Sequence, residues 1–190
     1  MSTEAVTPAG RRTRDALLDA GVAVAETHGL AGLSVNRVVA QADVAKGTFY
    51  VHFSDRTAFV DALHGRFHAR VSDAVSVATR GLEPGAERVL RGADTYLDAC
   101  LADRAIKALV MEARGDGALT DSMSERQNAF SVRAEPDFRA LGWRDAAIAA
   151  RLFTALTSEV AMLELEAGKK LSAARRTLRG FVGAAGLGFS

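Results

Sequence analysis

Polar side chains that can read DNA bases gather in two short segments near the N-terminus. Asn36 and Arg37 open the first segment, and Lys46 and Thr48 open the second. Asparagine can bond adenine in two places, lysine and arginine favour guanine or phosphate, and a threonine methyl group can meet the thymine methyl group. The chemistry that these residues could perform is recognition of double-stranded DNA.

Further polar residues extend this set. Tyr50 and His52 stand at the end of the second segment. The expected helix starts near Ser34 and near Arg56 present backbone amides that can hold phosphates. The candidate DNA-binding residues are Ser34, Asn36, Arg37, Lys46, Thr48, Tyr50, His52 and Arg56.

Three helices are expected to position these side chains. Apolar residues recur at helical spacing over 13–28, and Gly29 stands where a glycine closes a helix. Ser34 can cap a second helix over 35–42, and after a tight turn a third covers 46–51. Such a unit is a helix-turn-helix, whose second short helix enters the major groove.

Longer helical segments fill the rest of the chain. Asp55 can cap a fourth helix, Pro136 is expected to interrupt a later one, and Ser172 is expected to cap the last. The expected helices after residue 85 cover about 86–102, 104–114, 120–134, 144–167 and 172–187. The sequence thus predicts an all-α protein of about nine helices, in which a three-helix headpiece joins a C-terminal helical bundle.

Composition and charge narrow the class of protein. The chain has 190 residues, of which 48% are apolar, and 24 basic residues face 23 acidic ones. A disordered chain and a protein that coats polyanions through a large positive field are therefore excluded. No stretch approaches 18 uncharged apolar residues and Cys100 is the single cysteine, so we expect no membrane span, no disulfide and a reducing cytoplasm.

The second segment also carries a family signature. Gly47-Thr48-Phe49-Tyr50-Val51-His52-Phe53, followed by Asp55-Arg56 and Phe59, resembles the motif of the tetracycline-repressor (TetR) family. Ala25-Glu26-Thr27-His28-Gly29 and Ser34-Val35 are similar to the end of that family's first helix and the start of its second. The resemblance covers about residues 11–63. It implies a homodimeric regulator, most often a repressor, whose C-terminal bundle binds a small molecule and then releases DNA.

The resemblance also assigns roles. It implies phosphate contacts at Ser34 and Arg56, base contacts at Asn36, Lys46 and Thr48, and backbone contacts at Tyr50 and His52, whereas Phe49 and Phe53 pack the headpiece. Two positions depart from the family. Asp43 stands where family members usually have glycine in the turn, and Ala45 where they often have a capping serine or threonine. A missing cap costs about 0.5–2 kcal/mol of helix stability.

The last two expected helices are a candidate dimer interface. Apolar residues form a continuous stripe along the first, and glycines at close spacing in the second allow two helices to approach. The alternative is an ordinary core within one chain. The candidate interface residues are Ile148, Leu152, Leu156, Val160, Leu163, Leu178, Phe181, Val182 and Ala185.

A ligand cavity is expected between the fourth helix and the middle helices. Such pockets are mostly apolar with a few placed polar groups, although each candidate could instead be plain core. The candidates are Phe67, Val71, Tyr96, Leu97, Leu101, Met111, Glu112, Asn128, Phe130, Trp143, Phe153 and Thr157. Asp61, His64 and His68 share one helix face and could ligate a metal, but such groupings are common by chance, and we assign no metal or other cofactor.

The sequence therefore predicts a cytoplasmic, non-enzymatic regulator that binds a palindromic operator as a dimer and is released by a small organic effector. Residues 1–10 are expected to form a flexible arm, 11–60 the DNA-binding domain and 61–190 the ligand-binding and dimerisation domain. An enzyme or small-molecule carrier built on a helical bundle is the rival class, but no phosphate-binding glycine loop, H-E-x-x-H or G-x-S-x-G motif is present. A DNA-binding activator remains open beside a repressor.

Overall fold

A computed structural model describes residues 7–103 and 117–183, and every regular element in these residues is an α-helix, as predicted. The expected segment 104–114 lies outside the described residues, so eight helices stand against the nine predicted. They are α1 (Pro8–Gly32), α2 (Val35–Gln41), α3 (Lys46–His52), α4 (Arg56–Ala78), α5 (Ala86–Ala102), α7 (Gly117–Ala140), α8 (Ala146–Ala167) and α9 (Ser172–Gly183).

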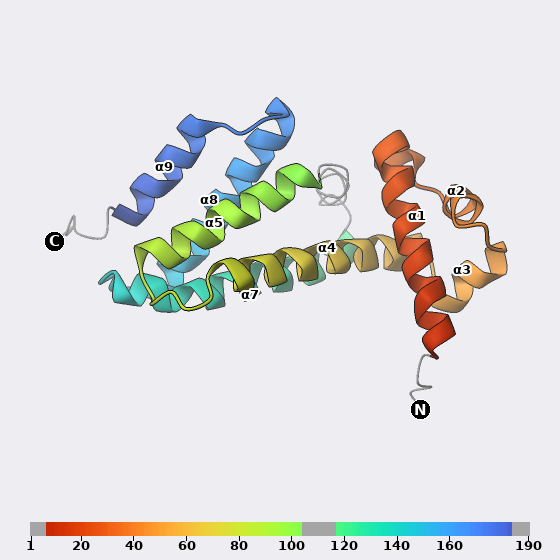
Figure 1. Cartoon of the computed structure of the whole chain (residues 1–190), viewed down its shortest axis with the longest axis horizontal. Coiled ribbons are helices and arrows are strands. Elements are labelled where there is room, and N and C mark those ends of the chain that lie inside the picture. Colours follow the sequence, from red (N-terminus) through yellow and green to blue (C-terminus); the bar gives the residue numbers. More distant parts are fainter. Residues whose placement is uncertain (1–6, 104–116, 184–190) are drawn as a thin grey trace.

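The helices form a headpiece and a bundle joined by one long helix (Figure 1). Helices α1, α2 and α3 gather at one end of the molecule, and α4 leaves them to run alongside α7. Helices α5, α8 and α9 cover the other end, with α8 packed against both α5 and α7. Helix α4 is therefore shared by both parts.

Side-chain caps set the helix starts in the headpiece. The hydroxyl of Ser34 accepts a hydrogen bond from the Arg37 backbone N–H at 3.3 Å, and the carboxylate of Asp55 accepts one from the Ala58 N–H at 2.8 Å. Each bond satisfies an N–H that has no partner within its helix. Both caps were predicted from the sequence and are confirmed.

The turn between α2 and α3 contains both departures from the family pattern. Asp43 has a positive φ of 52°, which aspartate tolerates less readily than glycine. Ala45 precedes α3 and supplies no side-chain cap. Helix α3 is therefore held by packing, chiefly by Phe49, which is fully buried and whose ring centroid lies 5.2 Å from that of Phe59 on α4.

Helix α1 crosses α4 at a point where only a glycine fits. A Cβ atom added to Gly21 would lie 2.5 Å from Cζ of Phe59 and 3.2 Å from a methyl carbon of Leu63. Both neighbours are almost fully buried, so neither can move aside easily. The close approach fixes how the headpiece sits on α4.

Two sequence predictions about helix ends are wrong. Pro136 does not interrupt its helix, because α7 continues to Ala140, and the buried side chains of Asp137 and Phe138 anchor the segment beyond the proline. Their packing offsets a cost of about 3 kcal/mol for proline inside a helix. Ser172 is the first residue of α9 rather than its cap, since the carbonyl of Leu171 accepts from the Arg175 N–H.

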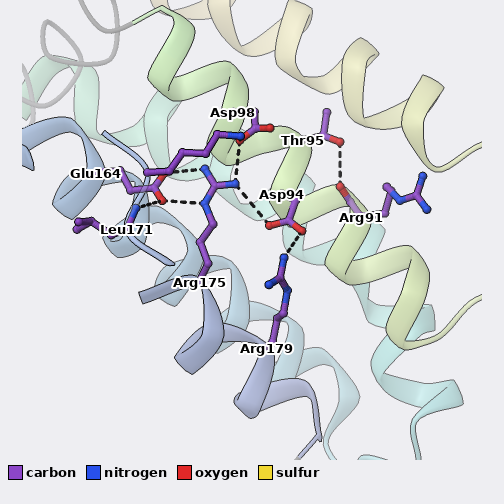
Figure 2. A network of polar contacts seen from close by, with 9 residues as sticks. Arg91, Asp94, Thr95, Asp98, Glu164, Leu171, Arg175 and Arg179 are labelled. Atoms are coloured by element: carbon purple, nitrogen blue, oxygen red, sulfur yellow. Dashed lines mark hydrogen bonds and ion pairs between the residues drawn. The ribbon is translucent and has the colours of Figure 1, made fainter. Parts of the chain in front are cut away.

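A cluster of ion pairs joins α5, α8 and α9, and within it Glu164 and Arg175 are buried (Figure 2). Arg175 donates to both carboxylate oxygens of Glu164, each at 2.7 Å, and to Asp98 at 2.8 Å. The Leu171 N–H donates to the same Glu164 carboxylate at 2.9 Å, and Arg179 pairs with Asp94 at 2.7 Å. We call Asp98, Glu164 and Arg175 the Arg175 cluster.

In this cluster, burial disfavours the ionised form of Glu164, whereas hydrogen bonds favour it. Only 1% of Glu164 is exposed, which by itself raises the pKa of its carboxyl, but the hydrogen bonds from Arg175 and from the Leu171 N–H outweigh burial and leave that pKa below its usual value. The two carboxylates in turn raise the pKa of Arg175. The cluster is therefore fully ionised at neutral pH.

Candidate nucleic-acid interface and cavity

One face of α3 is open to solvent. Lys46, Gly47, Tyr50 and Val51 are exposed, with Tyr50 exposed at 51% and Val51 at 79%, while Phe49 faces the core. Helix α3 lies at the end of the molecule away from the bundle (Figure 1). A protruding helix with an exposed face is the shape that enters a major groove.

The other predicted DNA-binding residues surround this face. Asn36 is exposed on α2, whereas Ser34, Thr48 and His52 are half-buried. The Ser34 hydroxyl is engaged as the α2 cap. The structure thus brings the predicted set together on α2, α3 and the two adjoining helix starts.

Arg37 and Arg56 have a structural role that the sequence did not reveal. Nη1 of Arg37 donates to the Gly32 carbonyl at 2.9 Å, and Nε of Arg56 donates to the Leu33 carbonyl at 2.7 Å. Both arginines therefore hold the connection between α1 and α2. A phosphate contact by either would use the remaining N–H groups of its guanidinium.

Val51 is the surface residue that sequence reasoning missed. The family motif contains Val51, and no DNA contact was predicted for it, yet among the described residues it is the most exposed large apolar side chain, on the same face as Gly47 and Tyr50. The signal was available, because helical spacing that buries Phe49 turns residues 50 and 51 outward. An exposed apolar side chain on such a face can meet a thymine methyl group.

A cavity of about 300 Å³ lies between α4, α5, α7 and α8. Four of the predicted ligand-contacting residues line it: Tyr96, Phe130, Phe153 and Thr157. Other predicted residues lie elsewhere in the bundle. Phe67, Val71 and Leu97 are buried in the core, Leu101 is half-buried, Asn128 is exposed, and Trp143 stacks on Phe181 at 5.2 Å. Met111 and Glu112 lie outside the described residues.

The charged lining of the cavity could not be found from the sequence. Arg88 on α5, Arg126, Arg133 and Asp137 on α7, and two histidines on α4 all reach it. These residues come from helices far apart in the chain, and no local pattern marks them. The apolar part of the lining was predicted in part, through Phe130 and Phe153, but its charge was not.

Asp61, His64 and His68 face an arginine. Arg126 donates to both carboxylate oxygens of Asp61 at 2.8 and 3.1 Å, and its Nη1 lies 2.9 Å from Nδ1 of His64. Nε2 of His68 lies 2.9 Å from the Arg126 carbonyl, and the Ser122 hydroxyl donates to Asp61 at 2.7 Å. We call these residues the Arg126 cluster.

This cluster ties α4 to α7 at the level of the cavity. The hydrogen bond from Arg126 lowers the pKa of Asp61, burial opposes this, and the bond from Ser122 lowers it further. Among the described residues, no three His, Cys, Asp or Glu side chains are placed so that they could hold a metal ion. Arg126 also lines a second hollow beside the headpiece, together with Arg14, His52 and Phe53.

The predicted dimer-interface residues divide into two sets. Those exposed on α8 lie at helical spacing: Ile148 (56%), Leu152 (52%), Leu156 (42%) and Leu163 (40%). Val160, Leu178 and Val182 are buried within the chain, Phe181 is half-buried, and Ala185 lies outside the described residues. On α9, Gly180 and Gly183 are also exposed, and a Cβ at either would meet nothing within 4 Å.

The apolar residues of α8 also give this helix the hydropathy of a possible membrane span. Among the described residues it alone is long and apolar enough to cross a membrane, with a hydropathy of 1.4. This is weak support for a span, because core helices of soluble proteins share the property, and 39% of the apolar window is buried in the fold.

The chain has a helix-turn-helix headpiece, a long connecting helix and a helical bundle with a cavity. This architecture is typical of DNA-binding regulators in which one polypeptide carries both the headpiece and the cavity. The family model described as "Bacterial regulatory proteins, tetR family" matches residues 17–63. Residues 17–63 therefore match the headpiece of the tetR family, and the prediction from the motif is confirmed. No curated protein matches the sequence.

Solved structures extend the likeness to the whole fold. A transcriptional regulator from Rhodococcus sp. Rha1 is 19% identical, with a TM-score of 0.78 over 90% of this chain and 95% of that one. A TetR-like transcriptional regulator from Rhodococcus sp. RHA1 is 20% identical, with a TM-score of 0.73 over 93% and 96%. The multidrug binding protein EbrR, solved with imidazole, is 20% identical, with a TM-score of 0.69 over 89% and 94%. At these identities the likeness establishes the fold.

Proposed function

We propose that the protein is a dimeric, non-enzymatic transcriptional repressor that binds a palindromic operator and is released by a small organic molecule in its bundle. The observation that carries the DNA-binding part is the exposed face of α3 in a headpiece of the tetR family. Lys46 and Tyr50 lie on this face, and Asn36 is exposed on the preceding helix. The same proposal implies that double-stranded DNA is the partner of the headpiece and that the protein acts in the cytoplasm.

The exposed stripe on α8 supports the dimer. Four large apolar side chains at helical spacing, from Ile148 to Leu163, are exposed by 40% or more. The glycines exposed on α9 would let a partner helix approach closely. Two copies that join these faces make a four-helix bundle and place two headpieces on one duplex, about 34–36 Å apart for adjacent half-sites.

The Arg126 cluster supports coupling between ligand and DNA. Arg126 lines the cavity on one side and the hollow beside the headpiece on the other, and it is bonded to Asp61 on α4. A ligand that displaces Arg126 would loosen α4 from α7. Because α4 begins in the headpiece, this shift changes the spacing of the two headpieces, which is rigid-body allostery.

The DNA contacts are tested with a fluorescent duplex from the region upstream of the protein's own gene. Lys46→Ala is expected to weaken binding about tenfold or more, and Tyr50→Phe to weaken it less. Arg91→Ala is the matched control, since Arg91 is exposed on α5 in the bundle. Unchanged affinity in both headpiece variants would contradict the assignment of α3 and favour a small-molecule carrier.

The dimer is tested by sedimentation. Leu152→Glu is expected to give a folded monomer, because it places a charge in the proposed apolar interface. Val132→Glu is the control, since Val132 is 61% exposed on α7 and outside the proposed interface. Equal effects of the two substitutions would contradict the α8 interface.

A further inference from the structure

The cavity contains a buried charged donor without an acceptor. Arg88 stands in the first turn of α5, and its Nε donates to Asp137 at 2.6 Å. Its Nη2 is buried and has no hydrogen-bond partner within the described part of the chain. Buried donors on charged groups are almost always satisfied, so this atom marks a place where an acceptor is missing.

The guanidinium of Arg88 is held in position on its other side. Asp137, which is only 3% exposed, accepts at Oδ1 from Arg88 and from the Gly85 N–H at 2.9 Å. This pair fixes one edge of the guanidinium before any ligand arrives. The planar fork of arginine matches a carboxylate, and a fork held in advance loses less entropy on binding.

Charge balance around the cavity favours an anion. Three arginines line it, at positions 88, 126 and 133, against the single carboxylate of Asp137. Asp61 lies outside the lining and neutralises Arg126, while Arg133 donates to the Ser72 carbonyl and the Ser76 hydroxyl. The ion pairs Arg88–Asp137 and Arg126–Asp61 leave the positive charge of Arg133 without a carboxylate, so a cationic ligand is disfavoured.

The remaining wall sets the body of the ligand. Val75, Val89, Tyr96, Phe130 and Phe153 supply apolar surface, and the rings of Tyr96 and Phe130 meet edge to face with centroids 5.5 Å apart. The volume of about 300 Å³ is twice that of a cavity of about 150 Å³ that holds benzene. A molecule of one fused ring pair, or a short aliphatic chain, would fill it.

The geometry points to a small organic carboxylate as the ligand of this cavity, with its carboxylate on Arg88 and its apolar body between α4, α5, α7 and α8. The inference rests on the proposed function, since it names the chemical class of the effector. Neither the headpiece nor the family fold implies a carboxylate ligand, and a change confined to Arg88 would remove the proposed carboxylate contact.

Calorimetry on the full-length wild-type protein without DNA tests the class of ligand. The probes are 2-naphthoate and octanoate, each compared with its primary amide and with the ammonium compound of the same skeleton. The carboxylates are expected to bind at least about tenfold more tightly than the amides, and the ammonium compounds most weakly. Equal affinities, tighter binding of the amides or cations, or no binding of either acid up to about 1 mM would overturn the proposal.

Arg88→Met tests the residue. It is expected to abolish the preference for acid over amide, whereas Arg91→Met, one turn further along α5 and outside the cavity lining, should leave it intact. Arg88→Lys keeps the charge without the fork, and it is expected to retain part of the preference even if the methionine variant folds poorly. An unchanged preference in Arg88→Met would contradict the role of Arg88, and a full wild-type preference in Arg88→Lys would contradict the role of the fork.

A DNA-release assay separates this inference from the proposed function. Binding of 2-naphthoate with the expected preference, but without release of operator DNA, would uphold the carboxylate site and overturn ligand-controlled release. Release by the neutral amide at the same concentration as by the acid would overturn the carboxylate site and uphold ligand-controlled release.

Discussion

Two arginines on different helices hold the bundle together in contrasting ways. Arg175 is only 8% exposed, and it is paired with carboxylates from α5 and α8. The side chains of Arg126 and Asp61 are 22% and 35% exposed, and they join α4 to α7 beside the cavity. A buried cluster resists rearrangement, whereas a partly hydrated one can open at low cost. The first cluster is therefore suited to stability and the second to movement.

Arg175→Met should produce the largest effect. It leaves Glu164 buried without its cation, and loss of one partner of a buried pair costs about 3–5 kcal/mol. Urea unfolding of the full chain measures the change. Arg179→Gln, which removes an exposed arginine one turn further along α9, should cost about 1 kcal/mol or less. Similar losses in both variants would erase the contrast between buried and exposed pairs.

Combining Glu164→Leu with Arg175→Met should cost less than the sum of the two single changes. Arg175→Met leaves the buried charge of Glu164 uncompensated, and Glu164→Leu leaves Arg175 with Asp98 alone as its close partner, while the double variant removes the buried pair as a whole. The double-mutant cycle should give a coupling of about 1–3 kcal/mol. Additive losses would mean that the two side chains contribute independently.

Acid should reduce the effect of Arg175→Met. In the wild type the pKa of Glu164 lies below its usual value, so its ionised form stabilises the fold above about pH 4 and this contribution is lost as pH falls. Without Arg175 the buried carboxyl has a raised pKa and folds more readily when protonated. The difference in unfolding free energy between the two proteins should therefore shrink from pH 7 to pH 4, and a constant difference would contradict the assigned cause.

Arg126→Gln should have the smallest effect on stability and a distinct effect on DNA binding. Because the pair with Asp61 is partly hydrated, its loss should cost about 1 kcal/mol or less. Operator affinity should fall by a few-fold, since α4 is no longer tied to α7. Fluorescence anisotropy with operator DNA measures this affinity. The control is Arg139→Gln, which removes an exposed pair with Glu135 on α7. A large loss of stability with unchanged DNA affinity would reverse the assignment.

The headpiece was predictable because its signals are local. Ser34 and Asp55 cap helices a few residues away, and Phe49 and Phe53, which the family resemblance assigned to packing of the headpiece, are buried together with Phe59. The two arginine clusters were not predictable. Arg126 meets Asp61 across 65 positions of sequence, and Arg175 meets Asp98 across 77. Such pairs depend on how helices pack, which no periodicity encodes.

Pro136 and the cavity illustrate the same limit. A proline indicates the end of a helix on local grounds, but the burial of Asp137 and Phe138 beyond it keeps α7 continuous. The aromatic residues of the cavity were among the predicted candidates, whereas Arg88 was not, because its significance lies in an unpaired nitrogen that only the packed structure reveals.

The proposed regulator must read a specific DNA sequence through α3. Fluorescence anisotropy at two salt concentrations should compare a duplex from the upstream region of its own gene with a shuffled duplex of equal composition. We expect binding to the upstream duplex at least about 10³-fold tighter than to the shuffled one, and weaker binding to both at higher salt. Equal affinity for the two duplexes at both salt concentrations would contradict it.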